Sequence, residues 1–453
     1  MSLIPYQTYK STNLQWIERL PGHWELKALK HCIARLGSGG TPESGNPDYW
    51  TDDDDEEGMP WVSIGDMTTS PIVTSTQKRI TRSGLASKGL EIFPVGSLLY
   101  SIYASLGKVA TLGIDATFNQ AILAIVPDEK TVSQSYLCYW LQSLEPHLAY
   151  YASSNTQANL NAAKVLSYPV ALPSQEEQLV IARFLDRETA KIDALIAEQQ
   201  RLIELLQEKR QSVISHAVTK GLNPNAPMKD SGVEWLGEVP EHWVVTPIKH
   251  VCKIGNGSTP NKENPAYWQE GHFPWLTSTS VNEDQIKTAN AYVTEQALLA
   301  CSLPIVEPPA VLVGITGQGK TRGMAATLRI KCTINQHLAF LKPHSDNARI
   351  DFLRSAIDNL YAYFRRDTDG AGSTKGAITC SQLGLYKVAV PPPTEQEEIE
   401  ASIGLAQSAM SELMKDAERN VELLQERRSA LISAAVTGQI DVRGLVEAEG
   451  GEQ

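Results

Sequence analysis

The sequence predicts an α+β protein in which two similar mixed α/β domains are separated by two long helices that pair as an antiparallel coiled coil. Three features of the chain support this prediction: an internal duplication, short β-rich runs in each copy, and a long helical seam at the end of each copy. A chain of 453 residues has room for two large domains and their connecting segments.

The duplication becomes visible when 218 is added to a residue number. Leu205–Thr219 then falls on Leu423–Thr437, with 10 of 15 residues identical. Gly37–Trp50 falls on Gly255–Trp268 in the same way. Other matches are displaced by one or two positions, which indicates small insertions in loops. The chain is therefore predicted to be two copies of one structural unit.

The first part of each copy combines strands with turns. The apolar runs Gly96–Ala104 and Pro309–Thr316, bounded by glycine and proline, are typical of strands. A helical pattern follows at Ser133–Leu144 in the first copy and at Arg349–Phe364 in the second. Each copy should therefore contain a sheet followed by a packed helix.

A long helix closes each copy. Prolines mark its start, and the glutamates that follow suit the first turn of a helix. Each helix has about 40 residues and should span roughly 60 Å. The apolar seam recurs at steps of three and four and needs a partner. The other copy's helix is the obvious partner, although each helix could instead fold back on its own domain. The predicted seam consists of Ile181, Leu185, Ile192, Leu195, Leu202, Leu206 and Val213, with Ile399, Ile403, Met410, Leu413, Leu424 and Leu431 in the second copy.

These patterns predict the boundaries of the parts. The expected spans are 1–172 for the first mixed domain, 173–219 for the first helix, 220–232 for a linker, 233–390 for the second mixed domain, 391–437 for the second helix and 438–453 for a tail.

Composition argues against several classes of protein. Apolar residues make up 42% of the chain, which is enough for packed cores. The six cysteines contain no CxxC pair, which argues against a zinc ribbon or a disulfide framework and favours reduced thiols in a cytoplasmic protein. No stretch approaches the ~18 apolar residues of a membrane helix, and the N-terminus lacks the pattern of a secretory signal.

The net charge of -12 is unfavourable for a protein that binds nucleic acid. The acidic run Asp52–Glu57 alone supplies six of these negative charges, and such a run is usually a solvated loop. Because phosphate contacts depend on the local field, a local basic groove is compatible with this total.

Two short motifs are similar to enzyme signatures but lack their structural context. Gly314–Thr321 fits GxxxxGK[ST], the pattern of a phosphate-binding loop, which must open a helix. The residues after it indicate another strand, so we expect a β-hairpin turn with an exposed lysine. The NPxY tetrapeptides at Asn46 and Asn264 are similar to part of an adenine-N6 methyltransferase motif, but its second proline and glycine-rich cofactor loop are missing. We therefore expect neither a catalytic site nor a metal site.

An ordered set of short motifs occurs in both copies. It runs from His-Trp through GxTP, NPxYW, Pro-Trp, Gly-Lys and Asn-Gln to a proline boundary with Glu-Gln and a long helix ending in Ala-Val-Thr. In this order and twice over, the chain resembles the specificity subunit of type I restriction–modification enzymes, over roughly residues 10–440. The second copy departs from the first at Gln269–Asn290, as two different target sequences would require.

The resemblance implies that each mixed domain is a target-recognition domain that reads one half of an asymmetric, split DNA site. The long helices would set the gap between the half-sites and dock two methyltransferase subunits. In this family the modification subunits bring S-adenosylmethionine and methylate adenine at N6, and the restriction subunits bring ATP- and Mg-dependent translocation and cleavage. The chain itself would be non-catalytic and bind no cofactor. Its expected partners are double-stranded DNA and these subunits, in the cytoplasm and without a membrane, in defence against phage.

Contacts to DNA can be predicted at the level of motifs. Phosphates are bound by cationic side chains, and base edges are read by amide, hydroxyl and cationic groups. Asn119-Gln120 and Asn335-Gln336 occur in both copies, so they are expected to stabilise a shared loop instead. The expected phosphate contacts are Lys108, Lys320, Arg322 and Lys375. The expected base-reading loops contain Ser38, Gly39, Gly40, Thr41, Gln157, Asn159, Asn161, Asn256, Ser258, Thr259, Ser373 and Thr374.

Two other hypotheses stay open at this point. A duplicated adaptor that binds only proteins would show no sequence preference on duplex DNA and no basic groove on its mixed domains. An enzyme with a phosphate-binding loop would lose nucleotide binding on substitution Lys320→Ala.

Overall fold

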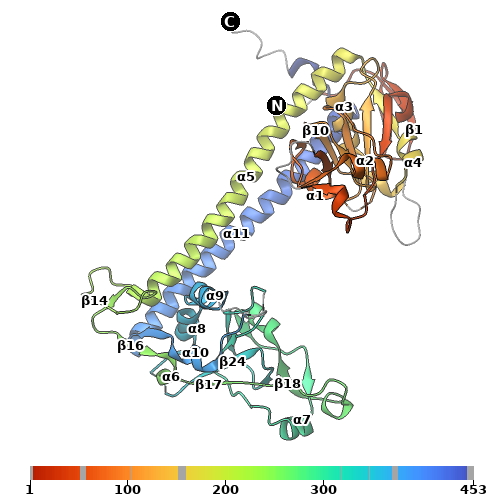
Figure 1. Cartoon of the computed structure of the whole chain (residues 1–453). Helices are drawn as coiled ribbons and strands as arrows, with labels where there is room; N and C mark the ends of the chain where they lie inside the picture. The colour runs from red at the N-terminus through yellow and green to blue at the C-terminus, as the bar shows by residue number, and fades with distance from the viewer. Residues whose placement is uncertain are drawn as a thin grey trace. The chain divides into compact units, whose positions relative to one another are not determined.

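The structure is a computed structural model that describes residues 4–51, 58–103, 105–150, 160–317, 319–345, 347–369 and 376–445 (Figure 1). The chain forms two compact units. Unit 1 comprises Met1–Gln199 and Arg419–Gln453, and unit 2 comprises Gln200–Glu418. Each unit contains one half of each long helix, so the helices are parts of the units and not separate domains.

Unit 1 is built on a five-stranded sheet among its described residues. Most neighbouring strands are antiparallel, and the short edge strand β7 joins in parallel. The middle strand is buried on both faces, with Leu98, Leu99 and Tyr100 all fully buried. The strand order is β4 (Ile33–Ser38), β12 (Ile122–Pro127), β9 (Leu98–Ser101), β10 (Val109–Leu112) and β7 (Ile72–Val73). A second sheet has the order β11 (Thr117–Phe118), β6 (Met59–Val62), β8 (Lys78–Ile80) and β5 (Trp50–Thr51).

Unit 2 repeats the main sheet with the same strand order and directions. Its edge strand also joins in parallel. The order is β17 (Cys252–Asn256), β24 (Leu338–Pro343), β21 (Ala310–Gly314), β22 (Ala325–Leu328) and β19 (Gln285–Ile286). A smaller sheet has the order β20 (Tyr292–Val293), β18 (Phe273–Leu276) and β23 (Thr333–Ile334). This shared topology confirms both the duplication and the α+β fold class.

Two-stranded sheets and short helices complete the two units. Unit 1 adds β1 (Tyr9–Leu14) with β2 (Ile17–Pro21), β3 (Glu25–Ala28) with β13 (Pro169–Leu172), and helices α1 (Ile64–Thr69), α2 (Arg82–Ser87), α3 (Gln134–Ser143) and α4 (Ala162–Leu166). Unit 2 adds β14 (Met228–Asp230) with β15 (Glu238–Pro240), β16 (Val244–Pro247) with β25 (Lys387–Val390), and helices α6 (Ile248–Val251), α7 (Glu295–Ala300), α8 (Ile350–Asp358), α9 (Tyr361–Asp369) and α10 (Cys380–Leu385). Short 3₁₀ turns occupy Leu29–His31, Pro47–Tyr49, Glu145–Tyr150, Pro265–Tyr267, Ser278–Asn282 and Arg443–Leu445.

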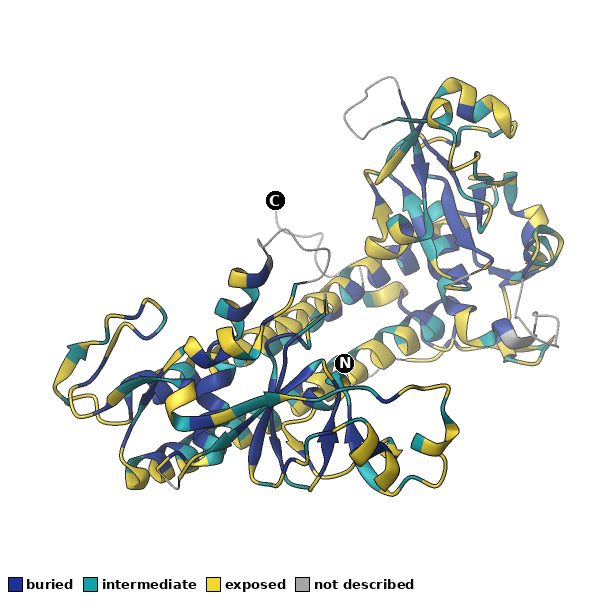
Figure 2. Cartoon of the chain, turned by 60° about the horizontal axis from the view of Figure 1, so that its bottom comes forward, coloured by how far each residue is buried: buried dark blue, intermediate teal, exposed yellow. Residues whose placement is uncertain are grey.

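The long helices α5 (Gln175–Lys220) and α11 (Pro393–Val436) enter the cores of both units. In unit 1, the start of α5 and the end of α11 lie side by side and run in opposite directions (Figures 1 and 2). Arg428 of α11 forms an ion pair with Asp193 of α5, with 2.8 Å between nitrogen and oxygen. The core of unit 1 contains Leu185 from α5 together with Val436 from α11. Each domain therefore packs against its own helix and against the helix of the other copy.

The seam of the helices differs from the predicted one at three positions. Leu195 and Leu202 on α5 and Leu413 on α11 are exposed, at 46%, 41% and 53%. Their neighbours Ile196, Ile203 and Met414 are the less exposed residues. The less exposed stripe on α5 is Leu185, Thr189, Ile192, Ile196, Gln199, Ile203, Leu206, Arg210, Val213 and Ala217, and on α11 it is Gln407, Met410, Met414, Ala417, Val421, Leu424, Arg428, Leu431 and Ala435.

A glutamate at the start of each long helix explains the repeated His-Trp and Glu-Gln motifs. In unit 1, Glu177 at the start of α5 accepts hydrogen bonds from His23 (2.9 Å) and the Trp24 indole (3.2 Å). In unit 2, Glu395 at the start of α11 makes the same bonds with His242 and Trp243. Trp24 and Trp243 are almost fully buried. Each motif pair therefore ties the first strands of a unit to its long helix.

A group of four charged residues connects α5 to the mixed domain in unit 2. Arg210 lies 3.5 Å from Asp284, which also contacts Arg354 at 3.5 Å. Arg354 in turn pairs with Asp358 at 2.5 Å. Burial raises the pKa of the Asp358 carboxyl to about 6, with Asp284 adding to this effect against the opposing charge of Arg354.

The raised pKa of Asp358 predicts how the stability of unit 2 depends on pH. The folded carboxyl binds its proton more tightly than the unfolded one, whose pKa is 3.8. Its ionisation therefore destabilises unit 2 as pH rises from about 4 through about 6, with no further change above. We expect Asp358→Asn to be more stable than the wild type at pH 7.5 by about 3 kcal/mol, and this advantage to vanish near pH 4.

Urea unfolding across pH, followed by hydrogen exchange in unit 2, measures this difference. Asp416→Asn on the exposed side of α11 is the matched control and should track the wild type. Parallel curves for Asp358→Asn and the wild type over the whole pH range would contradict the assignment.

Candidate nucleic-acid interface

Most of the predicted DNA-contacting segments meet at one end of the main sheet. In unit 1, Ser38 at the end of β4 pairs with Leu123 near the start of β12, and Ser101 at the end of β9 pairs with Ile122. The turn from β9 to β10 leaves from this end too. We call this edge of unit 1 its loop end.

Unit 2 has the same loop end. Asn256 at the end of β17 pairs with Ala339, and Gly314 at the end of β21 pairs with Leu338. The turn from β21 to β22 leaves from this end of its sheet. The duplicated sequence thus presents two equivalent sets of loops on two equivalent sheets.

The glycines of the two GxTP segments are explained by close backbone packing. A Cβ on Gly39 would lie 2.1 Å from the carbonyl oxygen of Asn119, and a Cβ on Gly257 would lie 1.7 Å from that of Ile334. Gly40 donates its amide to Phe118 and accepts the indole N–H of Trp61. These glycines position the loop, and their own polar groups are used within it.

Substitution Gly257→Ala is expected to destabilise unit 2 by about 1–3 kcal/mol, because the new methyl group would overlap a backbone carbonyl that cannot rotate away. Urea denaturation monitored in unit 2 measures the loss. Gly404→Ala, on the open side of α11, is the control, and should stabilise by about 0.5–1 kcal/mol. A urea midpoint for Gly257→Ala equal to that of the wild type would show that the GxTP loop can shift to make room for the added methyl group.

A threonine–glutamine pair holds each GxTP loop in place. Thr41 donates to Gln120 in unit 1, and Thr259 donates to Gln336 at 2.5 Å in unit 2. Asn119 accepts the amide of Ala121, a bond that Asn335 repeats in unit 2. Both Asn-Gln dipeptides therefore contribute to a loop framework common to the two units, as expected for residues present in both copies.

The NPxYW motifs have a structural role next to these loops. Asn46 caps a 3₁₀ turn by accepting the amide of Asp48 at 3.0 Å, and Asn264 caps the equivalent turn in unit 2. The Trp50 and Trp61 rings meet edge to face at 5.0 Å, as their counterparts in unit 2 do.

Two of the predicted contacts differ in the structure. Arg322 is 2% exposed, and its guanidinium fills the space beside Gly376, so in this conformation it is not a surface phosphate contact. Asn161 caps α4 by accepting the amide of Lys164 at 2.9 Å. The burial of Arg322 depends on how the chain folds back and cannot be read from a sequence pattern, whereas an asparagine directly before a helix is a recognised N-cap signal.

The structure also shows that Lys108 and Lys320, which the repeated Gly-Lys motif matched to each other, are not at equivalent positions in the two units. Lys108 and Met324 occupy equivalent positions, because their carbonyls accept the amides of Ser101 and Gly314. Lys320 lies in the additional part of the longer unit 2 turn and is exposed. Ser38 and Asn256, equivalent to each other, are exposed at the loop ends. The predicted residues Gln157, Asn159, Ser373, Thr374 and Lys375 lie outside the described residues.

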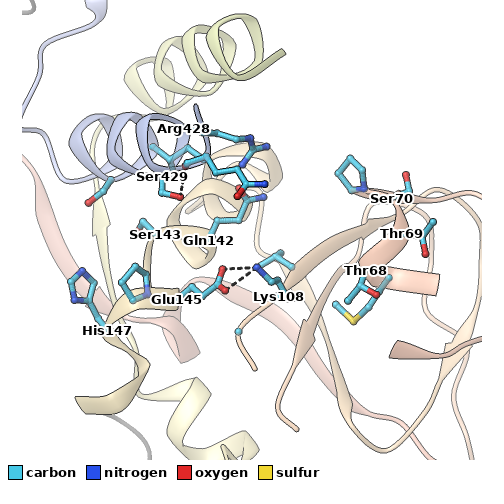
Figure 3. A pocket seen from close by; sticks show the side chains of 18 residues that line it. Thr68, Thr69, Ser70, Lys108, Gln142, Ser143, Glu145, His147, Arg428 and Ser429 are labelled. Carbon is cyan, nitrogen blue, oxygen red and sulfur yellow. Dashed lines mark hydrogen bonds and ion pairs between the residues drawn. The ribbon is translucent and has the colours of Figure 1, made fainter. Parts of the chain in front are cut away.

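A cleft of about 860 Å³ opens in unit 1 between the mixed domain and α11 (Figure 3). Lys108 points into it and pairs with Glu145 at 2.8 Å. Arg428 on its other wall pairs with Asp193. Burial lowers the pKa of His147 at its edge and favours the neutral ring. The cations lining the cleft are thus balanced by carboxylates, so the cleft is a weaker candidate for phosphate binding than the loop end.

The segment Gly314–Thr321 lies in a hairpin turn. The antiparallel strand β22 follows it, and Arg365 and Tyr361 bind the carbonyls of Gly319 and Lys320. A phosphate-binding loop requires a helix at this position. Among the described residues, no cluster of His, Cys, Asp and Glu could hold a metal ion, and no helix is long and apolar enough to cross a membrane.

Comparisons with known proteins agree with the duplicated architecture. A family model described as the type I restriction modification DNA specificity domain matches residues 21–206 and again residues 240–427. The MjaIX specificity subunit of a type I restriction enzyme from Methanocaldococcus jannaschii is 21% identical, over 95% of this chain and 96% of the relative. The EcoR124I/EcoR124II specificity subunit from Escherichia coli is 22% identical, over 66% of this chain and 69% of the relative.

A solved structure shares the fold. It comes from work on complex assembly and conformational transition of a type I R-M system, and it aligns with a TM-score of 0.66 at 16% identity. The alignment covers 93% of this chain and 99% of the other.

Proposed function

The chain belongs to the type I restriction modification DNA specificity family, and on this premise we propose that each unit reads one half of an asymmetric, two-part DNA site. Proteins of this kind are specificity subunits, in which catalysis is left to partner chains. This chain would direct adenine-N6 methylation and restriction by those partners, and S-adenosylmethionine, ATP and Mg would be bound by them.

The observation that carries the proposal is the pair of equivalent loop ends. Their framework is the same, with a closely packed glycine and a Thr–Gln pair in each. The exposed positions beside this framework differ, as Ser38 does from Asn256. One scaffold with two different reading surfaces is what recognition of two unlike half-sites requires.

The long helices support the proposed docking of two methyltransferase subunits. Leu195 and Leu413, which match after the shift of 218, are both exposed, and so are Leu205 and Leu423. Exposed leucines at matching places in both copies are equivalent apolar contact points, as docking of one partner to each copy would require. Double-stranded DNA, methyltransferase subunits and restriction subunits are the proposed partners, and the cytoplasm is the proposed location.

A methylome tests the proposal. The chain is expressed with its cognate methyltransferase subunit in a methylation-free host, and the DNA is sequenced with modification-sensitive reads. We expect a single split motif with two unlike halves and N6-methyladenine on both strands. The methyltransferase subunit expressed alone is the control. A soluble complex of the two proteins that leaves the genome unmodified would favour the adaptor hypothesis instead.

A further inference from the structure

The two loop ends can be compared position by position through their backbone hydrogen bonds. The amide of Ile102 donates to the carbonyl of Ala121 at 2.8 Å, and the amide of Ile315 donates to that of His337 at 2.9 Å. Ala121 and His337 are therefore equivalent.

The next residues in the two turns, Tyr103 and Thr316, are equivalent for the same reason. One backbone hydrogen bond is kept here while side-chain chemistry changes from tyrosine and alanine to threonine and histidine. Such positions are where two copies of one fold can acquire different sequence preferences.

In unit 2, these residues form a chain of hydrogen bonds with a fixed direction. Thr259 donates to Oε1 of Gln336, so the amide nitrogen of Gln336 faces Nε2 of His337, at 3.2 Å. An amide nitrogen can only donate, so Nε2 accepts and the proton of the neutral ring is on Nδ1. Nδ1 then donates to Oγ1 of Thr316.

The direction of these hydrogen bonds determines which donors remain free for a ligand at the surface. The hydroxyl of Thr316 accepts from histidine, so its own proton points elsewhere. Gln336 uses one amide proton on His337 and keeps the second. Gln336 is exposed and Thr316 is half-buried, so the network presents two hydrogen-bond donors at the loop end.

We propose that Gln336 and Thr316 read a guanine in the half-site recognised by unit 2, with the Thr316 hydroxyl donating to N7 and the Gln336 amide donating to O6, an inference that rests on the proposed function above. In the major groove, guanine presents two acceptors, N7 and O6. Adenine presents an acceptor beside a donor, thymine an acceptor beside a methyl group, and cytosine a donor. Donors on both residues therefore favour guanine, whose two major-groove edge atoms both accept. Ala121 and Tyr103 cannot build this network, so the preference belongs to unit 2.

The test uses the complex of the whole chain with its methyltransferase subunit, on duplexes that carry the motif found in the methylome. Each guanine is replaced in turn by 7-deazaguanine, which lacks the N7 acceptor, and initial methylation rates are measured. For the wild type, we expect one guanine in one half-site at which the rate falls about 5- to 150-fold. Thr316→Val should methylate the normal duplex more slowly and lose the sensitivity to this replacement, and Thr316→Ser should restore both.

Two controls separate the possible failures. Tyr103→Phe at the equivalent position of unit 1 should keep the sensitivity to 7-deazaguanine. A wild-type complex that methylates no split motif would overturn the proposed function itself. A wild-type complex that methylates a split motif, but for which no guanine is sensitive or Thr316→Val stays sensitive, would overturn the guanine assignment only.

Discussion

Replacing Gln396 by leucine is expected to destabilise unit 2 severely, by on the order of 4 kcal/mol. Gln396 is fully buried at the start of α11. Its side chain accepts the amide of Arg349 and donates to the carbonyls of Asn347 and Pro391, each at 2.7 Å. Leucine would fill the same space but leave these three backbone groups without their partner, at about 1–3 kcal/mol for each that stays buried.

Hydrogen exchange along the chain with increasing urea would measure this loss unit by unit. The substitution should lower the unfolding midpoint of unit 2. The equivalent Gln178 makes the same kind of contacts, with Ser133, Thr131 and Pro173. Gln178→Leu should therefore lower the midpoint of unit 1 instead. Glu398→Leu on the exposed side of α11 is the control for the added leucine. Equal midpoints for Gln396→Leu and this control would refute the role assigned to the buried amide.

These glutamines show which part of the fold the sequence could predict. Their place beside prolines and glutamates indicated a helix start, and repetition after 218 residues indicated an equivalent element in each copy. The contact of Glu177 with His23 and Trp24 joins segments about 150 residues apart. Local propensity carries no information about such a contact. The order of the motifs along the chain was therefore predictable, but their contact in the folded protein was not.

The register of the long helices was only partly predictable for a related reason. Leu195 and Ile196 are adjacent apolar residues, and so are Leu202 and Ile203 one heptad later. Both sets satisfy the spacing of three and four, so periodicity alone cannot choose between them. The polar residues Thr189 and Gln199 lie in the less exposed stripe and hide its continuity.

The candidate interface was predictable as a region and not as individual residues. The duplication identified the repeated loops at Ser38 and Asn256. Strand pairing places each loop beside the turn that follows the middle strand of its own sheet. Arg322 was expected on the surface because arginine usually is, but tertiary packing buries it. The role of His337 at the loop end was not predicted. Only its difference from the equivalent Ala121 indicates that role, and this comparison requires the correct alignment of the two copies.

Inserting one heptad into each long helix is expected to lengthen the gap of the DNA site by about one to three base pairs and to leave both half-sites unchanged. Duplicating 192–198 in α5 and 410–416 in α11 adds about 10.5 Å to each helix and keeps the seam in phase. One base pair rises about 3.4 Å, so three base pairs is the upper bound. Each added base pair also rotates the second half-site around the DNA axis. We therefore expect the gap to grow by no more than this upper bound.

The methylome of the variant complex measures the new gap directly. Seven residues inserted into the exposed linker segment at 223–226 provide the control, because this segment lies outside both helices, and the gap should stay unchanged. A heptad variant that still methylates the original motif with the original gap would show that the helices do not set the spacing. A variant with changed half-sites would show that the insertion reached the loop ends. The expected result, a new gap between two unaltered half-sites, would separate the role of the helices from that of the mixed domains.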